Sequence, residues 1–155
     1  MKLRIVALGH RTSAWEASGY AEYAKRLPRD YLVELVLLKP AARDSGKPAV
    51  QLLAAEALRI RTACAGYTVV ALDERGSAWT TRQLATRLKN WRERAQDVAF
   101  VIGSADGLDT AVKRDASAVF ALSALTLPHT LVRIILVEQL YRAASVIAGH
   151  PYHRD

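Results

Sequence analysis

The chain of 155 residues contains a single cysteine, Cys64. One thiol excludes an internal disulfide and any zinc site built from several cysteines. The absence of a disulfide framework is typical of proteins from reducing compartments, and we expect a cytoplasmic location.

Long apolar runs are also missing. The longest run in the last predicted helix, Ile134 to Val137, is far shorter than the about 20 residues that a membrane-spanning helix needs. The N-terminal Met1-Lys2-Leu3-Arg4 leads straight into a predicted strand, so we expect no signal peptide. We find no internal repeat and no low-complexity segment. The chain is therefore predicted to form one domain over residues 1–155, without contact with a membrane.

Acidic residues are scarce relative to basic ones. The 15 acidic and 22 basic side chains give a formal net charge of +7 and a pI of about 9.9. Such a balance favours a polyanionic partner such as a nucleic acid. A basic surface that serves only solubility is the alternative. Hydrophobic residues make up 51% of the chain, which is enough to bury a core.

Hydrophobic periodicity predicts strands that alternate with helices. The predicted strands cover residues 2–9, 31–38, 67–72, 97–102 and 119–122. The predicted helices cover residues 15–27, 50–64, 81–94, 108–114 and 131–148, with Thr12 or Ser13 capping the first and Thr80 the third. Residues 39–47 are predicted to form a solvated loop and residues 73–77 a turn. This alternation predicts an α/β fold with a mostly parallel sheet flanked by helices.

Three predicted strand ends are unusual together. The third ends in Leu72-Asp-Glu-Arg-Gly76, the fourth in Gly103-Ser-Ala-Asp-Gly107, and the fifth in the apolar loop Leu122–Leu127. Because the carboxyl ends of parallel strands lie at one edge of a sheet, these loops are expected to form the walls of one ligand pocket. The two glycines make an incomplete dinucleotide fingerprint, and a simple tight turn is the alternative explanation for them.

The last predicted helix is apolar on nearly every side, which is typical of a helix buried on most faces. It is either the core of one subunit or is partly covered by a second subunit. A polar line along it contains Glu138, Arg142 and Ser145. Glu138 and Arg142 have the spacing of a helical ion pair, and burial would favour a paired network or a site.

The C-terminal tail, His150-Pro-Tyr-His-Arg-Asp155, gathers reactive side chains. Histidine titrates near neutral pH, arginine binds phosphate, and tyrosine stacks on bases. A metal site is the weaker alternative, because His150 and His153 have no third ligand nearby in the sequence. The terminal residues of most domains are poorly ordered, which is the other possibility for this tail.

Four runs of residues resemble a known family. They are Leu122-Ser-Ala-Leu-Thr-Leu-Pro-His129, Leu131-Val-Arg133, Glu138-Gln-Leu-Tyr-Arg-Ala143 and His150-Pro-Tyr-His-Arg154. With the length of the chain, the opening Met1-Lys-Leu3, Gly9 and Leu72-Asp73, they resemble the RlmH family of the SPOUT superfamily. Its members are pseudouridine methyltransferases of the large-subunit ribosomal RNA.

The resemblance implies properties that the pattern of residues does not. It implies a SPOUT-type α/β fold whose C-terminal part is threaded into a trefoil knot, although knots are excluded as a working rule. It also implies a homodimer that binds S-adenosyl-L-methionine in the knot and needs no metal. The implied substrate is a pseudouridine of 23S rRNA, methylated at N3 on the assembled ribosome. By position, the implied cofactor residues are Leu72, Gly103, Leu122, Ser123, Ala124, Leu125, Thr126 and Leu127.

One segment departs from the family. The family usually has Gly-Gly-Pro-Glu-Gly after the fourth strand, where this chain has Gly103-Ser104-Ala105-Asp106-Gly107. Ser104 lacks the freedom of glycine at positive φ, and Ala105 lacks the stiffness of proline. These changes bear on the shape of the pocket and on its affinity for the cofactor.

Methyl transfer to N3 requires a base for the N3 proton and a cation near the anion that forms. We predict His153 as the base, with His129 in reserve beside the substrate. Arg142 and Arg154 are predicted to contact anionic groups, and Tyr152 to stack. A non-catalytic module that binds RNA or the ribosome would explain the charge and the tail but not the three loops. A dehydrogenase lacks a nucleotide fingerprint after the first strand.

Overall fold

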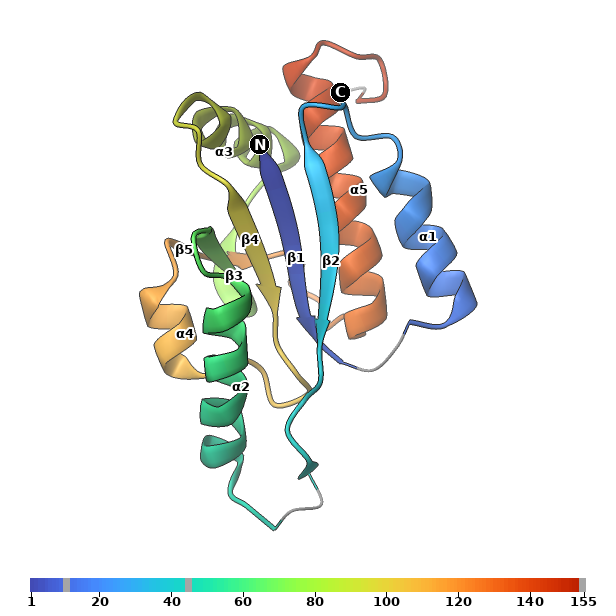
Figure 1. Ribbon diagram of the computed structural model, residues 1–155. Coiled ribbons are helices and arrows are strands. Elements are labelled where there is room, and N and C mark those ends of the chain that lie inside the picture. The colour runs from blue at the N-terminus through green and yellow to red at the C-terminus, as the bar shows by residue number, and fades with distance from the viewer. Residues whose placement is uncertain (10–11, 44–45, 154–155) are drawn as a thin grey trace.

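The computed structural model describes residues 1–9, 12–43 and 46–153. Within these residues, five strands form one fully parallel sheet in the order β2-β1-β4-β3-β5 (Figure 1). The strands are β1 (Lys2–Leu8), β2 (Leu32–Leu38), β3 (Thr68–Ala78), β4 (Val98–Ile102) and β5 (Ala118–Ala121). The helices are α1 (Ala14–Ala24), α2 (Ala49–Ala63), α3 (Thr81–Glu93), α4 (Thr110–Asp115) and α5 (His129–Ile147). The predicted α/β fold is confirmed.

Helices cover both faces of the sheet (Figure 1). Along β1, Leu3, Ile5 and Ala7 are buried together with residues of α3 and α5. Val6 and Leu8 are buried on the other side together with residues of α2 and α4. Successive side chains of a strand point to opposite faces, so a strand covered on both faces needs the nearly continuous apolar sequence that β1 has.

Local capping explains where two of the helices begin. Thr80 accepts a hydrogen bond from the Gln83 main-chain N–H at 3.2 Å, and the Thr80 N–H donates to the Gln83 side chain at 2.8 Å. Ser13 and Glu16 form the same reciprocal arrangement at the start of α1. Each pair satisfies main-chain donors that the first helical turn leaves unpaired. The predicted caps at Ser13 and Thr80 are confirmed.

The central helix of its layer is α5, which packs between α1 and α3. Its buried side chains include Leu136, Val137, Leu140 and Ala143, none of which is exposed to solvent. Other apolar residues of α5 are only half-buried, and Leu131 is 38% exposed. The helix is therefore less completely enclosed by its own chain than its sequence predicts. Of the helices in the described ranges, none is long and apolar enough to cross a membrane.

The segment predicted as a turn at residues 73–77 is instead part of β3. Leu72 and Ser77 both pair with Phe120 of β5, so the residues between them bulge out of the ladder. A Cβ atom at Gly76 would lie 2.7 Å from the Val119 carbonyl oxygen, so glycine permits this close approach. The polar sequence that predicts a turn here forms a large irregular bulge between Leu72 and Ser77, after which the strand continues.

Candidate functional site

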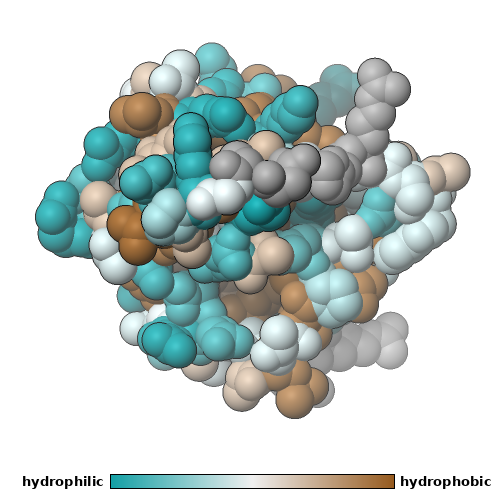
Figure 2. Space-filling view, turned by 90° about the horizontal axis from the view of Figure 1, so that it is seen from below, coloured by the Kyte–Doolittle hydropathy of each residue, from teal (hydrophilic) through white to brown (hydrophobic). Residues whose placement is uncertain are grey.

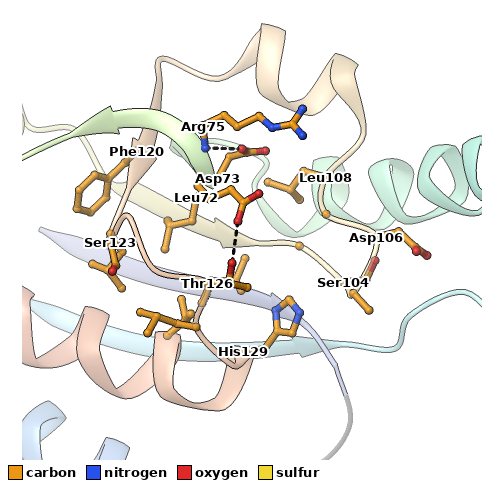
Figure 3. Close-up of a pocket in the computed structure, with 18 of the residues that line it drawn as sticks. Leu72, Asp73, Arg75, Ser104, Asp106, Leu108, Phe120, Ser123, Thr126 and His129 are labelled. Carbon is orange, nitrogen blue, oxygen red and sulfur yellow. Dashed lines mark hydrogen bonds between the residues drawn. The ribbon is translucent and has the colours of Figure 1, made fainter.

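A cavity of about 530 Å³ opens at the carboxyl ends of β3, β4 and β5. Figure 2 looks onto this end of the molecule, where a hollow with an apolar floor lies between hydrophilic side chains. The walls are the β3 bulge, the Gly103–Gly107 turn and the loop after β5, which Figure 3 shows facing one another. The prediction that three strand-end loops form one pocket is confirmed.

The loop after β5 forms the most apolar wall. Leu122, Ser123, Leu125, Thr126 and Leu127 all line the cavity. Ala124 is exposed and is not among the lining residues. Sheet pairing ends at Ala121, which pairs with Ala78, so the main-chain groups of this loop lie beyond the ladder. The Ser123 hydroxyl accepts a hydrogen bond from the Leu125 N–H at 2.9 Å, which tightens the bend.

The β3 bulge supplies Leu72 and three charged residues to the cavity. The Asp73 carboxylate accepts from the Arg75 N–H at 2.9 Å and from Lys113 Nζ at 2.9 Å. Burial alone would raise the pKa of Asp73, but these two donors outweigh it and lower the pKa. The Glu74 carboxylate accepts from the Thr126 hydroxyl at 3.2 Å, which joins the bulge to the loop after β5 (Figure 3).

The turn after β4 is a tight hairpin. Ser104 and Gly107 exchange main-chain hydrogen bonds of 3.2 and 2.8 Å. A Cβ atom at Gly103 would lie 2.4 Å from the Gly107 carbonyl oxygen, so this position excludes larger residues. Among the described residues outside glycine, only Ala95 has a positive φ. Ser104 therefore does not need the conformational freedom of glycine. Gly103 and Gly107 serve a tight turn, and that turn is at the same time a wall of the cavity.

His129 is the predicted substrate-contacting residue that lies in the cavity. It opens α5, and its side chain points toward the space below Thr126 in Figure 3. Burial lowers the pKa of His129, and the nearby charge of Arg133 lowers it further. The imidazole is therefore neutral at pH 7 and able to accept a proton.

The predicted tail residues lie elsewhere. His129, which lines the cavity, is the first residue of α5, whereas Arg142 is in its last turns and Tyr152 follows its end. The rise of the helix alone places Arg142 about 20 Å from His129, and Figure 1 shows the two ends of α5 at opposite ends of the sheet. His153 follows in the same half-buried tail, and Arg154 lies outside the described residues. Within one chain, the structure brings the predicted cofactor residues, except the exposed Ala124, together with His129 at the cavity. The predicted catalytic residues are not part of the lining.

The tail is nevertheless held in place. Arg142 donates to the Glu138 carboxylate at 2.9 Å, and the Tyr152 hydroxyl donates to the same oxygen at 3.1 Å. The ring of Tyr152 lies 4.5 Å from that of Tyr141 and 4.7 Å from the Arg142 guanidinium carbon. The hydrogen bond to Glu138 raises the pKa of Arg142 despite some burial. Glu138 and Arg142 of the polar line thus form a paired network that anchors the tail through Tyr152. Ser145 is outside it and donates to the Tyr141 carbonyl at 2.9 Å.

Sequence reasoning missed a second polar network behind the Gly103–Gly107 turn. Arg43, from the predicted solvated loop 39–47, reaches Glu56 of α2 and Asp106 of the turn. Part of that loop is therefore packed, and Ala41 is buried. A signal existed: Glu56 interrupts the apolar stripe of α2 between Leu52 and Ile60, at the four-residue spacing of one helix face.

Other chemistry finds no support in the described ranges. They contain no group of three or more His, Cys, Asp or Glu side chains arranged to hold a metal ion. Burial raises the pKa of Cys64 to about 11, so the thiol remains protonated and is a poor nucleophile. The cavity itself combines apolar side chains, such as Leu72, Leu122 and Leu127, with a comparable number of polar and charged ones. It lies outside the carboxyl ends of parallel strands, where open α/β sheets bind their ligands.

Comparisons with known proteins show which family the chain resembles. The profile described as "Predicted SPOUT methyltransferase" matches residues 1–153. A relative from Nitrosospira multiformis named "Ribosomal RNA large subunit methyltransferase H" is 56% identical over 155 residues, covering 99% of both chains. A relative from Paraburkholderia xenovorans with the same name is 51% identical over the same shares.

A solved structure agrees with the fold. The probable methyltransferase from Bordetella pertussis superimposes with a TM-score of 0.59 and 21% identity, covering 92% of this chain and 95% of that one. At this identity the likeness concerns the fold alone. Since the profile and the close relatives span nearly the whole sequence, the chain belongs to the SPOUT methyltransferase family.

Proposed function

We propose that the chain methylates N3 of a pseudouridine in the 23S rRNA of the large ribosomal subunit, with S-adenosylmethionine as methyl donor. It acts as one domain over residues 1–155, in the cytoplasm, where ribosomes are found. The observation that carries the proposal is the cavity at the three strand ends, in a chain 56% identical to a relative named as a ribosomal RNA large subunit methyltransferase. The trefoil knot stays a prediction from the family resemblance.

The cavity has the properties that the methyl donor requires. S-adenosylmethionine, when bound, supplies a methyl group on a positively charged sulfur. A volume of about 530 Å³ falls within the range of small-molecule sites. Leucines of the loop after β5 offer apolar surface for the adenine, and main-chain groups beyond the ladder offer hydrogen bonds to its edge. Of the two carboxylates in the β3 bulge, Asp73 is neutralised by Lys113 at 2.9 Å. The Glu74 carboxylate, which accepts only a neutral hydroxyl in the described contacts, offers negative charge to a cationic ligand.

The acceptor base must lose its N3 proton for methylation to occur. His129 lines the cavity and its lowered pKa keeps it neutral, so among the described residues it is a proton acceptor that the same chain offers. His153 remains our predicted base if a second copy brings its tail to this cavity. Arg142 and Arg154 would then stabilise the anion or bind phosphate, and Tyr152 would stack on a base.

A second copy of the chain would resolve the separation of the cavity from the tail. About 20 Å of helix lies between them in one chain, which is too far for one side chain to bridge. The half-buried apolar residues of α5 and the exposed Leu131 and Trp15 offer surface for a partner on this side of the sheet. We therefore propose a homodimer in which each cavity is completed by the tail of the other copy.

Two measurements test these proposals. Mass-spectrometric mapping of 23S rRNA from a strain that lacks the chain should reveal one missing methyl group, and return of the gene should restore it. Unchanged methylation together with ribosome binding would favour the non-catalytic module instead. Sedimentation at micromolar concentration should give twice the chain mass of 17.1 kDa. A monomer would contradict the shared site.

A further inference from the structure

The Gly103–Gly107 turn is braced from outside the cavity by one arginine. Arg43 Nη2 donates to Ser104 Oγ at 2.6 Å, and Arg43 Nε lies 2.7 Å from Asp106 Oδ2. Its third nitrogen, Nη1, donates to Glu56 Oε1 at 2.8 Å. A planar guanidinium has the fixed fork of donors that such three-way contact requires.

The anchor of this brace is a buried carboxylate. Glu56 is 1% exposed. Besides Arg43, it accepts from the Ala41 N–H at 2.9 Å and from the Ser104 hydroxyl at 2.9 Å. Burial would raise the pKa of Glu56, but the hydrogen bonds outweigh it and lower the pKa. A buried charge with this many partners is rigidly placed, because the loss of any partner leaves it undersatisfied.

The brace acts on a wall of the cavity. Every residue from Gly103 to Gly107 lines the cavity. The main-chain bonds between Ser104 and Gly107 fix the shape of the turn but do not fix its position relative to α2. Arg43 and Glu56 do so, because they hold both polar side chains of the turn. In Figure 3 the Asp106 carboxylate points away from Leu72 and Thr126, toward the outside of the cavity.

We propose that Arg43 is a positioning residue for the methyl donor: by holding Ser104 and Asp106 against Glu56, it sets the position of the Gly103–Gly107 wall. The proposal rests on the proposed function, since it assumes that the donor occupies this cavity. It assigns a role in donor binding to the segment after β2, none of whose described residues is part of the cavity lining. Ser104 and Asp106, where the chain departs from its family's usual sequence, are the residues that Arg43 holds.

The test is a double-mutant cycle read by calorimetric titration of the full-length protein with S-adenosylmethionine. Arg43→Lys keeps a positive charge beside Glu56 but cannot hold three partners, and Asp106→Ala removes one arm. Each change is expected to raise Kd about five- to tenfold, the effect of weakening one or two charged hydrogen bonds. The double variant should be little weaker than the worse single one, because both changes break the same contact.

A matched control uses an exposed ion pair that joins α2, the helix of Glu56, to α4. Arg61 of α2 lies 3.3 Å from Asp115, and both are exposed, so Arg61→Lys and Asp115→Ala should leave Kd within about twofold of the original value. In steady-state assays, Arg43→Lys should raise KM for the donor while kcat and KM for RNA stay unchanged. If Arg43 had a merely structural role, Arg43→Lys would lower the melting temperature and leave Kd and KM for the donor unchanged.

Three outcomes would overturn the proposal in different ways. If the unmodified protein binds the donor and the folded variants bind it equally well, the positioning role is wrong and the proposed function stands. If the unmodified protein binds no donor, the proposed function fails and the positioning role fails with it. If the fold-change in Kd of the double variant equals the product of the two single fold-changes, Arg43 and Asp106 do not act together.

Discussion

The two ends of α5 have different architectures although both carry reactive side chains. At its first residue, His129 faces a cavity whose walls come from three separate strand ends. At its other end, Arg142 and Tyr152 are tied to Glu138 on the surface of the same helix. The first arrangement has room for a ligand, whereas in the second the side chains bind one another. We therefore expect Arg142 and Tyr152, if they are catalytic, to act at the cavity of a second copy of the chain.

Deletion of residues 152–155 should separate the two ends most completely. The cavity remains intact, so the affinity for S-adenosylmethionine should stay within about twofold, while methyl transfer should fall by more than about a hundredfold because the proposed base and RNA contacts are lost. Donor binding by calorimetry and transfer of a labelled methyl group to rRNA measure the two effects. Full activity in the truncated protein would remove His153, Tyr152 and Arg154 from the mechanism.

Mixing experiments would sharpen the same comparison. A truncated chain and a chain with a blocked cavity should each be inactive alone, while their mixture should recover about a quarter of the activity if one dimer site combines a good cavity with a good tail. The same two variants tested separately are the control. A mixture without activity would place cavity and tail in the same chain.

Gly103→Ala provides the blocked cavity. The new Cβ would lie 2.4 Å from the Gly107 carbonyl oxygen, so the turn must move, and we expect the Kd for the donor to rise at least about tenfold with a loss of about 1–3 kcal/mol of stability. Gly107→Ala is a useful comparison, because a Cβ there meets open space and only the positive φ of 84° is strained. Equal effects of the two changes would argue for backbone strain rather than a displaced wall.

The lowered pKa of His129 predicts a pH dependence of stability. Folding disfavours its protonation, so the free energy of unfolding should be highest above its ordinary pKa of 6.5 and should decrease as the pH falls below that value. Urea unfolding at pH 7.5 and 5.5 should show a smaller difference for His129→Gln than for the unmodified protein. The exposed His150 is the control, and an identical change for His150→Gln would contradict the assignment to His129.

Tyr152→Phe should produce the smallest effect. It removes the hydroxyl that donates to Glu138 at 3.1 Å but keeps the ring beside Tyr141. We expect a loss of about 1 kcal/mol or less, measured by urea unfolding, with a decrease of a few-fold in methyl transfer if the anchored tail must be presented to a second copy. Unchanged transfer would mean that the ring contacts suffice to hold the tail.

Much of the fold follows from local sequence patterns. Alternating apolar segments predict each strand and helix, because burial on a sheet face or helix stripe needs a matching period, and polar caps such as Thr80 predict where helices begin. The β3 bulge does not follow from such patterns. Asp73 to Ser77 has the composition of a turn, and only the pairing of Leu72 and Ser77 with the same Phe120 shows that the strand continues.

The candidate site also has one part that the sequence predicts and one part that it does not. The polar and glycine-containing sequences after β3 and β4 and the apolar loop after β5 were enough to predict a pocket, because a parallel sheet places strand ends at one edge. The brace from Arg43 to Glu56 was not predicted, since the interrupted apolar stripe of α2 marks Glu56 as unusual but does not identify its partner. Charges this far apart in the chain meet only when α2 is packed on the sheet.

The sequence alone determined the order of elements, the strand ends that line the cavity and the family to which its motifs point, because each depends on residues close together in the chain. The tertiary structure alone decided that His129 lies in the cavity while Arg142 and Tyr152 lie about a helix length away, and that Arg43 holds the Gly103–Gly107 turn. Distances between segments depend on how helices pack on the sheet, and that packing is a sum of many weak contacts that no local pattern encodes.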